Sequence, residues 1–572
     1  MSYFFGDFVN YKNRYISSAF LLLLSSVIVK IIGAVYKIPL TSYIGAVGRG
    51  YFASAYNVYL PIHAVIMGAF PIALSKLTGK YAARDDSESL SALKKGSSRL
   101  FFKVGLGGML IMLALAKPYS VFVAASPKSI YTILVLTPSI LFSAFCASYR
   151  GYYEGFMNMV PTAVSQTIEA LFKLIFGLLA ARLSMAYFIE SYHLTGCVLG
   201  VSVKTEAQAL SMIYPVTSAF AMLGVTLGTV VSLLYVLIYH SINKTTLPRA
   251  GKALTKSLQS ELFSFSLPIM ISTAIQSVFQ FLDTATVQYA LKLAGNGAVL
   301  HAFAKLMAMS KTENTDAVTY AFGLFSTASD FKNLIPGITM ALGVCAVPAV
   351  SAAFELKNQN SLNSLINEIY KYTVLLSVWG GIFLYNSSEK ILNLFFSSSS
   401  PDIPSGCNML VKYFALTVPF YCLAGTAVFC TQAIGKAEKC ITPYVVCGII
   451  RSVFNIILVK NEKFLLFGAV ISGAAGYFLM GIWNVLIVKK YTKTDFSIKN
   501  ILLKPVFIGI CLTLFVKKLN FFEDFSQNLL INLLIEFVIC SLVFCILCLL
   551  FKSLNVKEIF CFIKSKKNAR NT

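Results

Sequence analysis

The chain has 572 residues, of which 57% are hydrophobic and only 13% are charged. That is too little polar surface to cover several soluble domains, and the composition also excludes disordered, collagen-like and disulfide-rich proteins. The 48 Lys and Arg outweigh the 24 Asp and Glu, giving a net charge of +24 that would indicate nucleic-acid binding in a soluble protein. We therefore predict an all-α polytopic membrane protein and test the charge against membrane topology.

Fourteen apolar segments approach or exceed the roughly 20 residues that a helix needs to cross a bilayer. Their hydrophobic runs are continuous rather than alternating, which favours helices over the strands of a membrane β-barrel. Within the less regular stretch 292–330, residues 298–309 are interpreted as an interfacial helix. The predicted spans are 16–40, 52–75, 100–116, 129–149, 160–181, 211–239, 262–291, 331–354, 369–386, 408–431, 441–460, 463–488, 500–516 and 528–551.

The positive charges follow the predicted topology. With the N-terminus inside, the inner segments hold more than twice as many Lys and Arg as the outer loops. The positive-inside rule therefore predicts that both termini are cytoplasmic, in agreement with an even number of spans. Because topology accounts for most of the charge and no Arg-Gly repeat accompanies it, no nucleic-acid partner is expected.

A faint repeat relates the two halves of the chain. Span 2 carries Pro61 and Pro71, and span 8 carries Pro336 and Pro348, each pair followed soon by a serine. Corresponding loops lie on the same side of the membrane, which indicates a parallel repeat of six helices plus six, as in many transporters. The predicted organisation is an N-terminal lobe at 1–240, a basic linker at 241–261, a C-terminal lobe at 262–490, an appended pair of spans at 491–553 and a basic tail at 554–572.

Several charged residues lie inside the predicted spans, where each costs free energy and tends to face a water-filled cavity or a partner. Lys30 and Lys37 are seven residues apart in span 1, so they share one face of a helix. A cavity-lining role is one interpretation of both. The alternatives are that Lys37 extends to the membrane interface and that Lys30 pairs with Glu169.

Span 5 contains Glu169 and Lys173 one turn apart, in the order that favours an intrahelical ion pair. They either neutralise each other or line a cavity. Span 7 carries a polar stripe of Gln276, Gln280 and Asp283. The Asp283 carboxylate is a candidate site for a cation or a proton, or a candidate partner of an amphipathic substrate. The alternative is that it lies at the outer mouth and only contacts water.

Arg451 in span 11 is the cationic candidate of the C-terminal half, with Asn455 one turn on. The alternative is that it only bonds neighbouring helices. Since most of the candidate residues are cationic, a cleft that they line would suit an anionic, phosphate-bearing substrate.

No enzyme motif is present in the sequence. A phosphate-binding loop, a His-Glu-x-x-His motif and a Gly-x-Ser-x-Gly motif are all missing, so no catalytic residue, metal site or cofactor is expected. Movement of a substrate would then depend on a coupling monovalent cation, the membrane potential or the supply of substrate.

The segment Tyr149–Glu169, which reads YRGYYEGFMNMVPTAVSQTIE, closely resembles the loop 4–5 signature of the stage V sporulation protein B group. Weaker matches lie at 33–40, 71–76 and 348–351. That group contains polysaccharide-export flippases of the multidrug/oligosaccharidyl-lipid/polysaccharide (MOP) superfamily, and the resemblance covers about residues 15–550. The loop 4–5 positions singled out are Arg150, Gly151, Glu154, Gly155 and Pro161.

The resemblance implies a MurJ-like fold with two lobes around a central cavity and two added helices. It further implies a flippase in the bacterial cell membrane that moves an undecaprenyl-pyrophosphate-linked cell-wall precursor, such as lipid II or a related polysaccharide unit, to the outer leaflet by alternating access. Lys30 falls roughly where such proteins carry a cavity arginine. The implied partners are the lipid-linked oligosaccharide with its anionic pyrophosphate, membrane lipids and cell-wall synthesis proteins.

Other functions stay open at this point. A cation-coupled multidrug antiporter of the same superfamily would need an acidic, aromatic cavity rather than a cationic one. A non-transporting scaffold for cell-wall or spore-cortex assembly would tolerate neutralisation of the charged residues within the spans. A membrane-bound glycosyl or acyl transferase should carry a clustered acidic or histidine motif in an outer loop, and the sequence has none.

Overall fold

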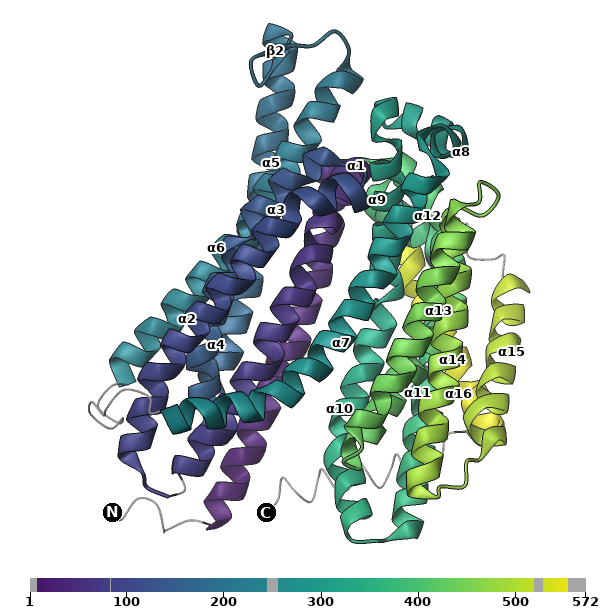
Figure 1. Ribbon diagram of the computed structural model, residues 1–572. Coiled ribbons are helices and arrows are strands. Elements are labelled where there is room, and N and C mark those ends of the chain that lie inside the picture. The colour runs from purple at the N-terminus through teal and green to yellow at the C-terminus, as the bar shows by residue number, and fades with distance from the viewer. Residues whose placement is uncertain (1–7, 83, 244–255, 519–527, 554–572) are drawn as a thin grey trace. The chain divides into compact units, whose positions relative to one another are not determined.

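The computed structural model describes residues 8–82, 84–243, 256–518 and 528–553, and helices make up nearly all of them (Figure 1). Most of the predicted linker 241–261 and all of the predicted tail 554–572 lie outside the described residues. Each of the fourteen predicted spans overlaps a helix. Within the described part of the chain, ten helical segments are long and apolar enough to cross a membrane, so the count of fourteen stays a prediction.

The chain divides into two compact units, which are described separately. Unit 1 comprises Met1–Thr327 with Ser452–Gly468, and unit 2 comprises Ala328–Arg451 with Ala469–Thr572. Helices α9 (Ala317–Lys332), α13 (Ile441–Lys460) and α14 (Leu466–Thr492) each contribute residues to both units.

Helix α1 (Phe8–Ala82) contains two predicted spans joined by a reversal at Gly45 rather than by a loop. Gly45 has φ 62° and ψ −175°, a backbone conformation that only glycine adopts readily. The rings of Tyr36 and Phe52 have centroids 6.0 Å apart, whereas a continuous helix would separate them by about 24 Å along its axis. The chain therefore folds back on itself at Gly45.

Helices α5 and α6 run side by side and are joined by the short antiparallel hairpin β1–β2 (Figure 1). A Cβ atom on Gly224 would lie 2.3 Å from the Cα atom of Gly177, so the two backbones approach closely, as small residues permit in membrane helices. A Cβ atom on Gly228 would lie 2.8 Å from the carbonyl oxygen of Glu169. This packing fixes the position of Glu169 on α5.

The elements between α1 and α7 have the bounds α2 Ser87–Pro118, η1 Tyr119–Val123, η2 Pro127–Ser129, α3 Ile130–Leu136, α4 Pro138–Gly155, α5 Val160–Thr195, β1 Cys197–Val198, β2 Val201–Ser202 and α6 Glu206–Ile242.

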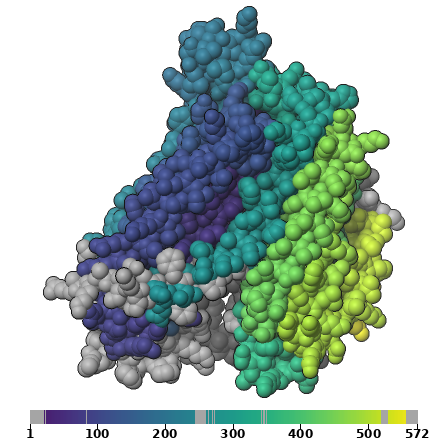
Figure 2. Space-filling view, in the orientation of Figure 1, coloured from purple at the N-terminus to yellow at the C-terminus, as the bar shows by residue number. Residues whose placement is uncertain are grey.

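Helix α7 (Lys256–Ala294) packs along α1, and Figure 2 shows it in teal beside the purple residues of α1. Hydrogen bonds of one α7 side chain join this helix to both α1 and η1. The amide of Gln288 donates to the Ser54 hydroxyl at 2.8 Å and accepts from the Tyr119 hydroxyl at 2.8 Å. After α7 come α8 (Asn296–Met309), which confirms the helix predicted at 298–309, and η4 (Asn314–Asp316).

The start of α9 lies against the reversal of α1. A Cβ atom on Gly323 would lie 1.7 Å from the carbonyl oxygen of Ala46, and one on Gly50 would lie 2.2 Å from that of Thr319. Beside this crossing the Tyr51 hydroxyl donates to the Asp316 carboxylate at 3.2 Å. Burial raises the pKa of Asp316 above its usual value. Close approach of the two backbones at Gly50 and Gly323 therefore joins α1 to the start of α9.

Unit 2 has its core between α11 and α12. Tyr370 and Val374 of α11 pack with Ala427 and Cys430 of α12, and all four are buried. A Cβ atom on Gly381 would lie 2.9 Å from the carbonyl oxygen of Ala415, so these two backbones also approach closely. The remaining bounds are α10 Leu334–Glu355, α11 Gln359–Phe396, α12 Asp402–Ala433, η5 Ala437–Cys440, η6 Lys499–Leu503, α15 Lys504–Lys518 and α16 Leu529–Leu550.

A charged contact attaches the very apolar helix α16 to α11. The Glu536 side chain, which is 6% exposed, accepts from the Lys390 ammonium at 3.1 Å and from the Ser387 hydroxyl at 2.7 Å. A lone carboxylate within an apolar helix is costly, so its pairing within unit 2 identifies the face of α16 that packs on α11.

We expect Glu536→Ala to lower the free energy of unfolding by about 2 kcal/mol, because Lys390 and Ser387 lose their shared acceptor. Thermal unfolding in detergent measures the effect. Glu536→Gln serves as the control, since it keeps an acceptor for Ser387 and should cost less than the alanine variant. Equal unfolding temperatures for wild type and Glu536→Ala would show that this contact does not hold α16.

Candidate functional site

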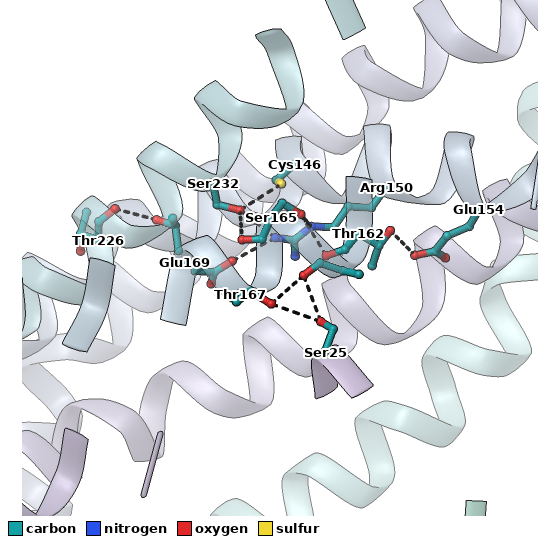
Figure 3. Close-up of polar contacts among 12 residues, drawn as sticks. Ser25, Cys146, Arg150, Glu154, Thr162, Ser165, Thr167, Glu169, Thr226 and Ser232 are labelled. Atoms are coloured by element: carbon teal, nitrogen blue, oxygen red, sulfur yellow. Dashed lines mark hydrogen bonds and ion pairs between the residues drawn. The ribbon is translucent and has the colours of Figure 1, made fainter. Parts of the chain in front are cut away.

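Arg150 is the centre of a buried polar network in unit 1 (Figure 3). Its side chain is 5% exposed and its Nη2 donates to the Glu169 carboxylate at 3.1 Å. The same Nη2 donates to the Ser232 hydroxyl at 2.7 Å, and Nε donates to the Ser165 hydroxyl at 2.8 Å. One guanidinium thus joins α4, α5 and α6, a task that suits its fixed fork of donors.

The motif around Arg150 is mostly helical, whereas the resemblance placed it in a loop. Helix α4 continues to Gly155 and α5 begins at Val160, so only four residues connect them. The Thr162 hydroxyl donates to the Glu154 carboxylate at 2.7 Å across this connection. Pro161 lies in the first turn of α5, where its missing N–H costs nothing.

The two motif glycines permit close contact with α1. A Cβ atom on Gly151 would lie 2.7 Å from the carbonyl oxygen of Pro71, and one on Gly155 would lie 2.7 Å from that of Ser75. Both glycines therefore act in packing. Together with Arg150 and Glu154, they explain the motif as the joint between the second, fourth, fifth and sixth spans.

Lys173 lies one turn beyond Glu169 but contacts α1. Its ammonium donates to the Tyr56 hydroxyl at 2.7 Å and lies 5.0 Å from the ring centroids of both Tyr36 and Tyr56. Such contacts stabilise a cation through the negative face of the ring. The Glu169 carboxylate pairs with Arg150 instead, so the two neighbouring charges of α5 are held by different helices.

Sequence reasoning missed the groups that receive these charges. Tyr36, Tyr56, Ser165 and Ser232 belong to residue types that occur throughout apolar helices, so nothing in the sequence distinguishes them. An aromatic row does continue along α1, where the Tyr59 ring lies 5.9 Å from Tyr56, but its spacing is that of ordinary helix packing.

The two lysines of the first half of α1 differ in exposure. Lys30 is exposed, and Lys37 is partly buried. Among the described residues the partner of Glu169 is Arg150 rather than Lys30, so the alternative in which Lys30 is neutralised by Glu169 does not hold. Roles for Lys30 and Lys37 in a cavity stay predictions.

The polar stripe on α7 reaches α13 at Asp283. The Asn455 side-chain amide donates to the Asp283 carbonyl oxygen at 3.0 Å, to its carboxylate at 3.3 Å and to the Thr286 hydroxyl at 3.1 Å. Gln276 is partly buried, whereas Gln280 is exposed. In the described part of the chain, no group of three or more His, Cys, Asp or Glu could hold a metal ion.

Arg451, the candidate of the C-terminal half, lies in unit 2. Its guanidinium carbon is 4.6 Å from the ring centroid of Tyr477 on α14. A Cβ atom on Gly476 would lie 2.8 Å from Cδ of Arg451, so the glycine makes room for the arginine side chain. Each unit therefore has a cation that contacts tyrosine, Lys173 in unit 1 and Arg451 in unit 2.

A sequence profile described as "Polysaccharide biosynthesis protein" matches residues 16–354, which is more than half of the chain. The chain belongs to the polysaccharide biosynthesis protein family. It is 24% identical to the protein "Lipid II flippase MurJ" of Bacillus subtilis (strain 168), over 85% of each chain. It is 21% identical to "Stage V sporulation protein B" of the same organism, over 96% of this chain and 97% of the relative.

Solved structures show the fold of this family member. A structure of lipid II flippase MurJ in an inward closed conformation matches with a TM-score of 0.64, at 16% identity, over 94% of this chain and 98% of that one. An inward-facing MATE transporter of the MOP superfamily matches with a TM-score of 0.61 at 14% identity. The match covers 83% of this chain and 99% of that one. The predicted all-α MOP-superfamily fold is confirmed, and the chain is a multi-pass membrane protein. Of these matched proteins, those whose names give an activity are a flippase and a transporter rather than enzymes.

Proposed function

We propose that this family member is a flippase that moves a lipid-linked saccharide with an anionic diphosphate to the outer leaflet by alternating access. The substrate class follows the relative named as lipid II flippase, which matches most of the chain. Both termini are then cytoplasmic, as the distribution of Lys and Arg favours.

The single observation that carries this proposal is the Lys173 ammonium. It lies between two tyrosine rings and on a tyrosine hydroxyl, within the spans of unit 1. Tyrosine faces stabilise a cation, and an ammonium binds a phosphate oxygen strongly in a medium where charge attraction is strong. A drug antiporter that accepts organic cations would be repelled by the same group.

Asp283 supplies the coupling role in this proposal. Its carboxylate lies beside the Thr286 hydroxyl and the Asn455 side chain, and oxygen atoms of this kind suit a monovalent cation or a proton. Differential binding at Asp283 in the two conformations would link ion movement to the movement of the lipid.

Replacing Lys173 by methionine keeps the length of the side chain and removes its charge. We expect the Lys173→Met variant to lose about tenfold to hundredfold in transport, because a hydrogen bond to a charged group contributes about 1.5–3 kcal/mol. The measurement is the exposure of labelled lipid II at the outer leaflet of a bacterial strain depleted of its own flippase.

The matched control is Lys204→Met, since Lys204 is exposed and lies in the connection between β2 and α6. Lys173→Arg should retain most of the transport. If Lys173→Met supports normal exposure of lipid II at normal protein abundance, Lys173 does not bind the substrate.

A further inference from the structure

Asp316 in η4 is a buried carboxylate that no sequence pattern singled out. The residue is 7% exposed and belongs to unit 1. Its Oδ1 accepts the hydrogen bond of the Tyr51 hydroxyl at 3.2 Å, whereas Oδ2 is buried with no hydrogen-bond partner among the described residues. An ionised carboxylate in such a place loses hydration that one hydrogen bond does not replace. The protonated carboxyl group carries no charge and needs less compensation.

Four elements meet around this carboxylate. Tyr51 belongs to α1 just after its reversal, and Ser211 lies near the start of α6. Lys128 belongs to η2, and Glu313 directly precedes η4. The Lys128 ammonium donates to the carbonyl oxygen of Ser211 at 3.0 Å and to its hydroxyl at 2.7 Å. This cation is therefore held by α6, and in the described part of the chain it forms no ion pair with Asp316.

The groups that face Asp316 act on its pKa in opposite directions. Burial raises this pKa most, and the neighbouring Glu313 carboxylate raises it further. The charge of Lys128 and the hydroxyls of Ser211 and Tyr51 lower it. Because burial outweighs them, the pKa stays above the usual value of an aspartate.

The surroundings of Asp316 suit a proton better than a metal ion. Metal ions such as calcium and magnesium take six or more oxygen ligands. This carboxylate offers one oxygen that is not already hydrogen-bonded, and the positive charge of Lys128 lies close enough to act on it. A proton needs only that one oxygen, and binding it removes the buried charge.

Asp316 lies beside the crossing at which the backbones of α1 and α9 approach each other. Thr319, three residues after Asp316, has its carbonyl oxygen against Gly50 of α1. The Thr319 hydroxyl also donates to the Ser126 hydroxyl at 3.0 Å, between η1 and η2. A movement of Asp316 would therefore be transmitted directly to the contacts of the first turn of α9.

We propose that Asp316 is a proton-binding site that makes the crossing of α1 and α9 sensitive to pH. With its proton bound, the carboxyl group stays buried against Tyr51 and the crossing stays closed. When the proton is released to water, the carboxylate is stabilised by reaching solvent or the Lys128 ammonium, and the start of α9 loosens. The topology proposed above places this crossing at the outer face, so the site would respond to the pH outside the cell.

The test measures thermal unfolding of the purified full-length protein in detergent from about pH 4 to about pH 8. The raised pKa means that the folded state binds the proton more tightly, so this stabilisation is present at low pH and is lost as the pH rises through that pKa. One linked proton changes the unfolding equilibrium constant by at most about tenfold per pH unit. Asp316→Asn keeps an acceptor for Tyr51 and cannot ionise. Its unfolding temperature should therefore fall less with rising pH than that of the wild type.

The matched control is Asp85→Asn, since Asp85 is an exposed aspartate of the same unit, in the turn between α1 and α2. Its unfolding temperature should follow that of the wild type at every pH. If Asp316→Asn shows the same pH dependence as the wild type, the proton site is overturned.

Two neighbouring charges provide variants that decide the matter even if Asp316→Asn does not fold. Lys128→Met removes a positive charge and should move the midpoint of the pH-dependent loss of stability to higher pH. Glu313→Gln removes a negative charge and should move the midpoint to lower pH. A merely structural role of these residues would change stability without such opposite shifts. Midpoints that stay at the wild-type pH in both variants overturn the site.

Hydrogen exchange locates the effect of the proton. After correction for the intrinsic exchange rate at each pH, the backbone amides of α9 should lose protection as the pH rises in the wild type but not in Asp316→Asn. Protection of α9 that does not change with pH in the wild type overturns the sensitivity of the crossing.

Salts of different cations distinguish a proton from a metal ion at this site. Sodium, potassium and choline chloride at equal ionic strength should give the same unfolding temperature at each pH. A rise that one metal cation alone produces in the wild type, and that Asp316→Asn abolishes, overturns the assignment to a proton, because a ligand of the folded state stabilises it. None of these outcomes depends on which lipid the protein transports.

Discussion

Arg150→Ala is expected to lower the free energy of unfolding by roughly 3 kcal/mol, the lower end of the range for breaking a buried ion pair. The substitution leaves the Glu169 carboxylate without the guanidinium that pairs with it. It also removes the hydrogen bonds that the Ser165 and Ser232 hydroxyls accept from Arg150. The effect stays at the lower end because the Glu169 side chain is 29% exposed and recovers part of its hydration. Thermal or denaturant unfolding in detergent measures it.

Two variants separate the parts of this network. Arg150→Lys keeps one charge but cannot donate to Glu169, Ser165 and Ser232 together, so it should fall between wild type and alanine. Glu169→Gln keeps a hydrogen-bond acceptor and should cost less than Arg150→Ala. An alanine variant as stable as wild type would contradict the assignment of Arg150 as the joint of α4, α5 and α6.

Gly323→Ala is expected to cost about 3 kcal/mol or more, the upper end of the range for overpacking. The new Cβ atom would lie 1.7 Å from the Ala46 carbonyl oxygen, so the backbones of α1 and α9 would have to separate. No truncation of a neighbouring side chain can relieve the clash, because the atom contacted is main chain. Loss of protein in the membrane and a lower unfolding temperature are the expected observations.

The control for this substitution is Gly297→Ala in α8 of the same unit, where a Cβ atom would meet nothing within 4 Å. It should be neutral or slightly stabilising, because alanine has less conformational freedom to lose than glycine. Equal stabilities of Gly323→Ala and Gly297→Ala would refute the close crossing of α1 and α9.

Much of the fold could be predicted from the sequence. Apolar runs of about 20 residues identify membrane helices because unpaired backbone groups are too costly in lipid, and every predicted span overlaps a helix. The helix at 298–309 was also predictable. The two spans at 16–40 and 52–75 predict that the chain turns between them, but the position of the turn at Gly45 was not predictable, because a single glycine there does not reveal that its φ is positive.

The candidate site was predictable only in part. Lys30, Glu169, Lys173, Asp283 and Arg451 stand out in the sequence because charge is rare in membrane helices. Their partners do not stand out. Glu169 and Lys173 have the spacing of an intrahelical pair, yet α4 holds the first and α1 holds the second.

The sequence by itself determined which apolar segments become long helices, because hydrophobicity is a local property of the chain, and the side of each loop stays a prediction from the distribution of Lys and Arg. Only the tertiary structure decided which charges meet. A buried Lys332 between Phe414 and Tyr477, like Arg150 among hydroxyls, depends on side chains far apart in the sequence. Helix packing brings these groups together, and no local pattern records such contacts.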